Sequence, residues 1–238
     1  MFKRVLIHEL KNIKRDKMYA FFAIYSVVMI VLAYFLIPYL DKTSIPLVVH
    51  LVTLVFILMI SFLFGAVTGF TLLDDQDDHV LLSLKITPIS VKKYIITKLL
   101  ISYLFGVLST ILLILVTMLP EIATPFELLM ICILAPMQAP IIALLINMVA
   151  SNKVEGFVIM KLSGIILLVP IAVLFLSNWT EIFLMVLPGF WPARLIAMEL
   201  IPANYLLGNS FMYFILGLIV NGIITWLFFK IYQKRIHI

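Results

Sequence analysis

Residues 74–88 read DDQDDHVLLSLKITP, and long apolar runs lie on both sides of them. Each of these runs is long enough to cross a lipid bilayer as a helix. An aspartate at the bilayer centre costs ~2.5–3.5 kcal/mol on insertion scales, so four of them would cost about 10 kcal/mol or more. The acidic stretch therefore has to lie outside the membrane, and it separates segments that must lie inside it.

The composition excludes a water-soluble domain. Of the 238 residues, 64% are hydrophobic and 12% are charged, whereas soluble domains carry about 25% charged residues. These polar side chains are too few to cover a water-facing surface, so the solvent must be lipid. The net charge of +5 is carried between the apolar runs, which argues against nucleic acid as a partner.

Six apolar segments predict an all-α integral membrane fold that forms a single transmembrane domain over residues 1–238. The segments are Tyr19–Tyr39, Ile45–Leu73, Tyr94–Leu119, Phe126–Ala150, Phe157–Leu176 and Phe211–Tyr232. The second is longer than one crossing requires, so we expect it to be tilted or broken. It also contains Gly65 and Gly69, a pair of small residues whose spacing permits close contact with a neighbouring helix.

The chain begins with a basic segment in which Phe2, Leu6, Leu10 and Ile13 recur on one helical face. We expect residues 1–17 to form an amphipathic helix on the membrane surface. The alternative is a basic topology signal without a docked helix. The apolar run that follows is longer than the core of a signal peptide, so we expect it to be retained as the first span.

Lys and Arg are distributed unequally between the two sides of the predicted spans. Of the 17 Lys and Arg, fifteen fall on the side that holds both termini, and Lys98 is counted there with the loop of residues 74–93. The opposite side has Lys42 and Arg194. Because basic loops stay in the cytoplasm, we expect a multi-pass plasma-membrane protein with both termini and this loop in the cytoplasm.

Within that loop, Asp78 is positioned to cap a helix that continues to about Ile86, and Pro88 disfavours helix at Thr87. The acids before it and Lys85 near its end complement the helix dipole, so we assign the acids to starting this helix rather than to chemistry. Such a helix has about nine residues, too few to persist alone in water. Its apolar residues, Val80, Leu81, Leu82 and Leu84, require a partner. That partner is either another protein or this chain's own inner surface.

Two further regions depart from plain apolar spans. Residues 136–140 read PMQAP near the middle of the fourth span, and these prolines free backbone carbonyls that a neighbour or a wet cavity must satisfy. Gln138, with Pro136 and Pro140, either lines a pathway or joins two helices. Residues 178–209 are apolar but are interrupted by charges and prolines, and they predict two short helices that dip into the outer leaflet, with Trp179 and Trp191 at the interface.

The run from Asp78 to Pro88 resembles the cytoplasmic coupling segment of ABC-2 type transporter permeases. Asp78 takes the place of the family's acid, Leu81 and Leu84 of its leucines, and Thr87-Pro88 of its Thr-Pro. His79, Val80 and Leu82 depart from the family's usual Gly, Thr and Glu. The basic first segment, the six spans and the broken outer segment are similar too. Within this family, the Asp-rich run resembles permeases of drug export, including fluoroquinolone export.

This resemblance implies an export subunit that works as a homodimer or heterodimer, each copy engaging a separate ABC ATP-binding subunit. The chain lacks the G-x-x-x-x-G-K-[ST] phosphate-binding sequence. We therefore expect it to be no enzyme by itself and to bind no cofactor, with ATP and Mg²⁺ on the partner. The residues expected to couple to the ATPase are Asp77, Asp78, His79, Leu81, Leu82, Leu84, Lys85, Thr87 and Pro88.

Two other functional classes compete with transport. An intramembrane enzyme needs His, Asp or Glu clustered inside the spans, and the acids here lie at span ends. A membrane anchor or sensor subunit would need no aqueous path, whereas the break at residues 136–140 favours transport. Because the spans are strongly apolar, we expect an amphiphilic or hydrophobic cargo, either drug-like or a peptide.

Overall fold

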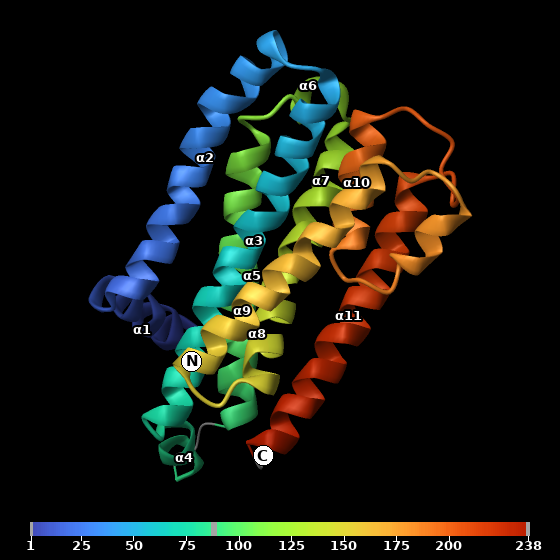
Figure 1. Cartoon of the computed structure of the whole chain (residues 1–238). Helices are drawn as coiled ribbons and strands as arrows, with labels where there is room; N and C mark the ends of the chain where they lie inside the picture. Colours follow the sequence, from blue (N-terminus) through green and yellow to red (C-terminus); the bar gives the residue numbers. More distant parts are fainter. Residues whose placement is uncertain (1, 87–89, 237–238) are drawn as a thin grey trace.

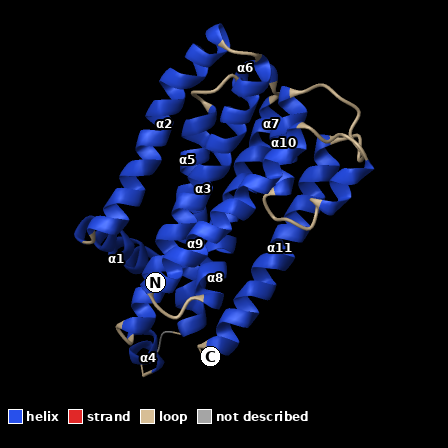
Figure 2. Cartoon of the chain, in the orientation of Figure 1, coloured by secondary structure: helices blue, strands red, loops and turns tan. Residues whose placement is uncertain are grey.

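The computed structural model describes residues 2–86 and 90–236, and within these residues the regular structure is entirely helical (Figure 2). The α-helices are α1 (Phe2–Arg15), α2 (Lys17–Thr43), α3 (Pro46–Asp77), α4 (Val80–Lys85), α5 (Val91–Ile114), α6 (Leu119–Ile122), α7 (Pro125–Leu134), α8 (Gln138–Val149), α9 (Lys153–Leu168), α10 (Phe190–Leu200) and α11 (Ser210–Arg235). Three 3₁₀ helices join them, η1 (Ala135–Met137), η2 (Val169–Leu174) and η3 (Trp179–Phe183). The predicted all-α class is confirmed.

In the described residues, six helical segments are long and apolar enough to cross a membrane. Each overlaps one of the predicted spans, so their number and order are confirmed. The first span extends further than the predicted Tyr19–Tyr39, because α2 continues to Thr43. The second span is not broken: α3 runs for 32 residues, a length of about 48 Å. It exceeds the ~30 Å hydrocarbon core, so its end can project from the membrane.

Helix α3 lies at the centre of the bundle and packs against α2, α5, α8 and α9. Its contact with α8 depends on the predicted pair of glycines. A Cβ on Gly65 would lie 2.6 Å from the carbonyl oxygen of Ala139, and one on Gly69 would lie 2.9 Å from the Ile146 side chain. At Gly65 the obstacle is backbone, so only glycine permits the approach there, and at Gly69 a larger residue would require the Ile146 side chain to move.

The fourth span breaks where the prolines predict it. Helix α7 begins at a capping box, in which Thr124 and Glu127 satisfy each other's backbone N–H groups. The chain then passes through η1 before α8 begins. Near this break, the Tyr103 hydroxyl on α5 donates to the carbonyl oxygen of Ile133 at 3.0 Å. A neighbouring helix therefore satisfies a backbone carbonyl there, as expected of a helix broken inside a membrane.

The segment of residues 178–209 contains η3 and α10, and α10 is mostly buried against α3, α7 and α11. The prediction for Trp191 is wrong. Its side chain is 3% exposed, and its indole N–H donates to the carbonyl oxygen of Met185 at 3.1 Å. Trp179, by contrast, is 64% exposed and suits an interface. The entry of this segment into a leaflet stays a prediction.

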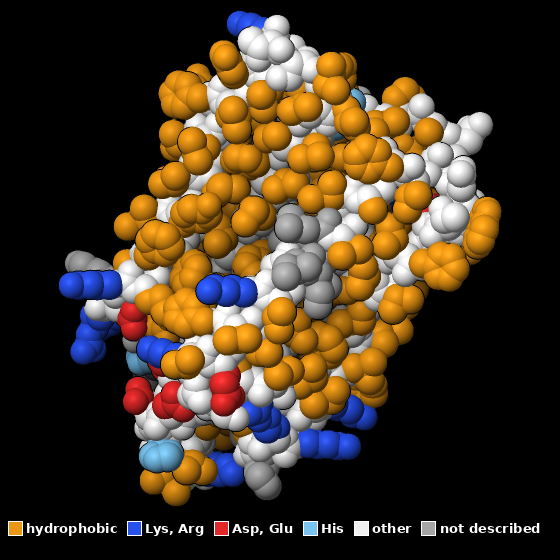
Figure 3. Space-filling view, in the orientation of Figure 1, with side chains coloured by type: hydrophobic (Ala, Val, Ile, Leu, Met, Phe, Trp, Pro, Cys, Tyr) orange, Lys and Arg blue, Asp and Glu red, His pale blue; other side chains and the backbone are white. Residues whose placement is uncertain are grey.

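The bundle has two distinct ends. Helix α4 and the C-terminus lie at one end, which we call the α4 end, and α6 lies at the other, the α6 end (Figure 1). Most charged side chains on the face shown in Figure 3 gather toward the α4 end, while hydrophobic side chains cover most of the remainder. The charge asymmetry of the sequence is therefore an asymmetry of the folded molecule.

Candidate functional site

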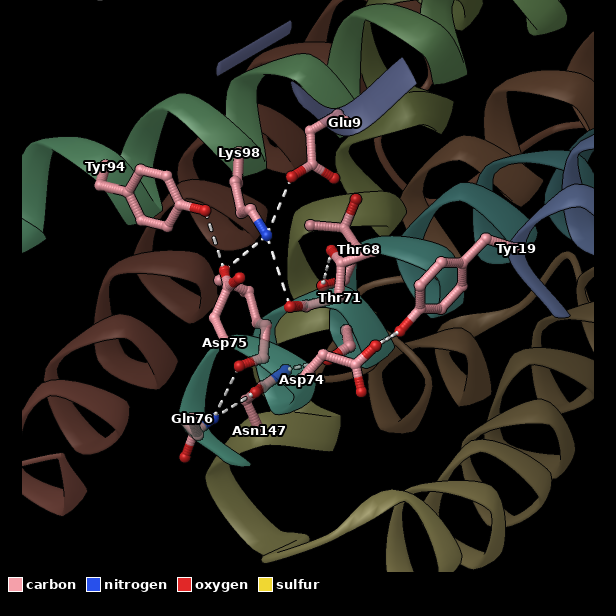
Figure 4. A network of polar contacts seen from close by, with 12 residues as sticks. Glu9, Tyr19, Thr68, Thr71, Asp74, Asp75, Gln76, Tyr94, Lys98 and Asn147 are labelled. Carbon is pink, nitrogen blue, oxygen red and sulfur yellow. Dashed lines mark hydrogen bonds and ion pairs between the residues drawn. The ribbon is translucent and has the colours of Figure 1, made fainter. Parts of the chain in front are cut away.

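The last turn of α3 carries Asp74, Asp75 and Gln76, which we call the hub. Consecutive helical residues point about 100° apart, so the three side chains leave α3 on different sides (Figure 4). In the part of the chain that the structure describes, their side chains connect to six other helices, of which α2, α5, α8, α9 and α11 are contacted directly and α1 indirectly. Asp75 reaches α1 through Lys98, and the remaining contacts are direct.

Asp75 lies in a buried ion cluster. The ammonium nitrogen of Lys98 on α5 lies 2.5 Å from the Asp75 Oδ2 atom and 2.9 Å from the Glu9 Oε1 atom on α1. The Tyr94 hydroxyl donates to the same Asp75 oxygen at 3.1 Å, and Lys98 also reaches the carbonyl oxygen of Thr71 at 3.4 Å. Glu9, Asp75 and Lys98 are 4%, 4% and 1% exposed. We call these three residues the ion triad.

The ion triad ties α1 and α5 to the end of α3. Two carboxylates share one ammonium group, so loss of Lys98 would leave two buried negative charges without their partner. Removing one partner from a buried ion pair commonly costs about 3–5 kcal/mol. Burial of the three charges costs desolvation free energy, and the contacts among them offset this cost. The main consequence of the triad is that α1, α3 and α5 have a defined position relative to one another.

Asp74 joins the hub to α2 and α9. The Tyr19 hydroxyl on α2 donates to one carboxylate oxygen of Asp74, and Lys153 on α9 lies 2.8 Å from the other. Lys153 also lies 3.8 Å from Asp16. The Lys153 side chain is 40% exposed, so solvent screens this pair and its contribution is about 0–1 kcal/mol. The Asp74 side of the hub is therefore the side that is accessible to solvent.

Gln76 joins the hub to α8 and α11. Its amide nitrogen donates to Asn147 Oδ1 at 2.8 Å and to the Tyr232 hydroxyl at 3.2 Å. Asn147 in turn donates to the carbonyl oxygen of Gly69 at 2.8 Å. At the end of α11, Arg235 donates to the carbonyl oxygen of Asn147 at 3.1 Å. The hub therefore extends as hydrogen bonds through the bundle to the last helix.

The predicted capping of the loop helix by Asp78 is wrong. Residues 74–77 continue α3, and the N–H of Asp78 donates to the carbonyl oxygen of Asp74, which ends that helix. His79 then takes a left-handed conformation with φ 56°, and α4 has six residues rather than about nine. Acids at a helix C-terminus oppose its dipole, which is why the sequence favoured a helix start. The buried Lys98 and the partly exposed Lys153 offset this opposition.

Helix α4 presents its leucines to different surroundings. Leu81 is 5% exposed and belongs to the buried cluster that includes Leu72 and Ile95, whereas Leu82 is 56% exposed and Ile86 is 91% exposed. The alternative that α4 packs on this chain's own surface holds for Leu81. Leu82 faces outward, and for it a partner protein stays a prediction. Asp77, Asp78, His79 and Lys85 are exposed, and Leu84 is partly buried. Thr87 and Pro88 lie outside the described residues, and the coupling role of the whole set stays a prediction.

A second buried ion cluster lies toward the α6 end. The Arg194 guanidinium on α10 pairs with Glu181 of η3 and donates to the carbonyl oxygens of Val173 and Leu176 at 3.1 and 2.6 Å. The Tyr213 hydroxyl donates to Glu181 at 2.5 Å. Arg194, Glu181 and Tyr213 are each 0% exposed. We call this group the α6-end brace, because it holds residues 173–213 together.

Comparison with known proteins connects this architecture to a family. The family model described as "Fluoroquinolones export permease protein Rv2686c-like" matches residues 9–229. The chain belongs to this family. The match runs from the first residue of the ion triad to the last helix, so it includes the hub, α4 and the α6-end brace.

Two curated members of the family come from Mycobacterium tuberculosis. They are the fluoroquinolones export permease proteins MT2760 of strain CDC 1551 / Oshkosh and Rv2686c of strain ATCC 25618 / H37Rv. Each is 27% identical over 183 residues, which cover 72% of this chain and 66% of the relative. The chain thus aligns with slightly less than two thirds of the length of these relatives.

The three residues proposed for a substrate pathway, Pro136, Gln138 and Pro140, lie in different surroundings in the structure. Gln138 is 1% exposed and donates to the carbonyl oxygen of Pro188 at 3.0 Å. It joins α8 to the loop before α10, which favours the second of its two interpretations. Pro136 is buried, and a Cβ on Gly106 would lie 3.1 Å from its side chain. Pro140 lines an apolar groove between α5 and α11.

Sequence reasoning missed the ion triad. The prediction that Lys98 belongs to the cytoplasmic loop is wrong, because Lys98 is buried two turns inside α5. A lysine this far inside a span requires a partner, and this signal was available in the sequence. Glu9 could not have been found in the same way, because its burial depends on how α1 packs against α5. Among the described residues, no three His, Cys, Asp or Glu side chains are grouped so as to hold a metal ion.

Proposed function

We propose that this chain is the membrane subunit of an ATP-driven exporter that moves amphiphilic or hydrophobic drug-like compounds out of the cytoplasm. Membership of the fluoroquinolones export permease family and six membrane-spanning helices support this role. A separate ABC subunit would bind ATP and Mg²⁺ and hydrolyse the nucleotide. A second permease copy, identical or related, would complete the pathway.

The α4 end is proposed to face the cytoplasm, in the plasma membrane. The excess of Lys and Arg on this side supports the orientation. The same end carries the exposed acids Asp77 and Asp78 and the exposed apolar residue Ile86. A surface of this kind is stable beside water and a protein partner, but not in the hydrocarbon core.

The connection between α4 and the hub carries the proposal. Only Asp77, Asp78 and His79 separate the last hub residue from the first residue of α4. Leu82 and Ile86 present apolar surface to a partner, while Leu81 holds α4 against α3 and α5. A displacement of α4 by the ATP-binding subunit would act first on the last turn of α3. The hub would then pass this displacement to the helices that it contacts.

The test replaces the exposed apolar residues of α4 with acids, in the double variant Leu82→Asp/Ile86→Asp. We expect at least a tenfold loss of the complex with a co-expressed ABC ATP-binding subunit, because burying each side chain contributes about 1.5 kcal/mol or more. Efflux of a fluoroquinolone should fall with it. Co-purification and drug accumulation are the measurements.

The matched control is Ile122→Asp on α6, between the third and fourth predicted spans, where Ile122 is an apolar residue that is 50% exposed. It should leave the complex intact. Unchanged co-purification and efflux in the Leu82→Asp/Ile86→Asp variant would contradict the coupling role. Loss of co-purification and efflux in the control alone would indicate that the partner binds at the α6 end, which also contradicts the proposal.

A further inference from the structure

An apolar groove of about 510 Å³ runs between α5 and α11, with residues of η1 and α8 at its floor. Its walls include Ile96, Leu100, Tyr103, Leu218, Trp226 and Phe229. Two hydroxyl groups lie along it, and both are already bonded to backbone: Tyr103 to the Ile133 carbonyl at 3.0 Å and Thr225 to the Asn221 carbonyl at 2.7 Å. The groove therefore offers an occupant almost pure hydrocarbon and aromatic contact.

The groove faces the bilayer, and its length along α11 matches the thickness of one leaflet. Its α11 wall extends from Leu218 to Phe229, a distance of about 16 Å along a helix, and half of the hydrocarbon core is about 15 Å. On the same helices, Leu104 and Leu108 are 46% and 55% exposed, and Ile223 is 51% exposed. Large exposed apolar side chains around the groove indicate that its mouth opens to lipid.

A lysine continues each wall toward the α4 end. Lys92 precedes Ile96 by four residues on α5, and Lys230 follows Trp226 by four residues on α11, so each shares a helical face with the groove. The Lys230 ammonium lies 4.0 Å from the centroid of the Trp226 ring. Both lysines are exposed, and across residues 2–86 and 90–236 neither has a carboxylate partner. Each wall of the apolar groove thus continues into a cation on its own helix.

We propose that this groove binds an anionic phospholipid of the leaflet at the α4 end, with one acyl chain in the groove and the phosphate between Lys92 and Lys230. The length of the groove along α11 matches the thickness of one leaflet, and the positive charge of the two lysines complements a single anionic headgroup. A drug site usually adds a few polar groups that orient the ligand, and both hydroxyls here are engaged by backbone. The shape and charge therefore favour a lipid.

Such a lipid would act on the hub through α5. Lys98 of the ion triad and Leu99 of the groove are consecutive on this helix, so they point about 100° apart. A chain in the groove would press on one side of α5 while the ion triad holds the other. The bound lipid would then set the position of α5 at the α4 end.

The test measures lipid binding to the full-length protein by native mass spectrometry, with phosphatidylglycerol and phosphatidylcholine as probes. We expect phosphatidylglycerol to bind more tightly, and Lys92→Gln or Lys230→Gln to weaken it by about fivefold each. Lys93→Gln is the matched control, since this exposed lysine lies next to Lys92 on another face of α5. Phosphatidylcholine binding should change little in all three variants.

A groove-filling variant supplies the second measurement. A Cβ on Gly222 would meet no atom within 4 Å, so Gly222→Phe can fold while its ring enters the groove. We expect it to reduce binding of both lipids, with an unchanged elution profile. Equal binding of the two lipids, equal effects of Lys92→Gln and Lys93→Gln, or no effect of Gly222→Phe would each overturn the proposal. A disulfide cross-link between two copies of the Leu104→Cys variant would also overturn it. So would saturable fluoroquinolone binding that displaces the lipid and that is lost in Gly222→Phe.

Discussion

The two buried ion clusters of this protein differ in composition and in the distances along the chain that they join. The ion triad has two carboxylates for one ammonium group and joins Glu9, Asp75 and Lys98 from three separate helices. The α6-end brace pairs one carboxylate with one guanidinium, and the carbonyls that complete it come from the same stretch of about 40 residues. The brace thus stabilises one local segment, whereas the triad connects parts of the chain that are distant in sequence.

This difference assigns different mechanical roles to the two ends. A balanced pair surrounded by its own segment has few alternative partners, so it keeps residues 173–213 in one arrangement. At the α4 end, two carboxylates compete for Lys98, and the hub continues into exposed groups such as Lys153. Small displacements there can redistribute contacts among several helices. The α4 end is therefore the end expected to respond to a partner.

The largest expected effect follows from replacing Lys98 with Met. Both carboxylates of the ion triad would lose their cation in a buried site, so we expect about 3–5 kcal/mol of destabilisation. Thermal unfolding of the purified protein measures this loss. Lys93→Met is the control, because Lys93 is exposed on the same helix. Equal melting temperatures for the two variants would show that the triad does not hold the α4 end together.

A smaller contrast compares neutral substitutions of one carboxylate in each cluster. Glu181→Gln leaves the Arg194 cation buried without an anion, which should cost about 3 kcal/mol or more. Asp75→Asn leaves Lys98 paired with Glu9, and the new side chain can still accept the Tyr94 hydroxyl. We expect about 1 kcal/mol for this second change. If Asp75→Asn proves the more damaging in a denaturation series, the triad has no surplus carboxylate and the two clusters are equivalent.

The third effect concerns the neutral side of the hub. Gln76→Leu replaces the amide with an apolar side chain of similar size and removes the donor to Asn147 and Tyr232. Unsatisfied buried partners cost about 1–3 kcal/mol, so melting should fall by less than in Lys98→Met. Gln233→Leu on α11 serves as the control. An efflux rate lost in Gln76→Leu at unchanged stability would indicate that this bond transmits motion rather than merely adding stability.

How far the sequence predicts this molecule depends on the kind of signal. The six spans follow from hydrophobic length, and the break in the fourth span follows from Pro136 and Pro140, because these are local properties. The hub does not follow, since the same four aspartates could start one helix or end another. Only the packing of Lys98 from α5 against α3 decides between these arrangements. Leu81 and Leu82 show the same limit: they are adjacent in sequence, and tertiary contact alone buries one and exposes the other.

The smallest effect belongs to the α6 end and appears as a pH dependence. Burial, with the neighbouring Glu127 carboxylate, raises the pKa of Glu199 to about 7 from an ordinary value of 4.5. The folded protein therefore binds this proton more tightly than the unfolded chain does, and stability falls as pH rises from about 4.5 to about 7.

Glu199→Gln should remove this fall, so the variant should match the original protein near pH 5 and exceed it near pH 8. The gain should stay below about 1 kcal/mol, because the carboxyl is only partly buried and solvent screens it. Melting temperatures at the two pH values measure it, with the exposed Glu121→Gln on α6 as control. A gain that is the same at pH 5 and pH 8 would mean that Glu199 does not titrate in this range. The pH dependence proposed for the α6 end would then have another source than Glu199.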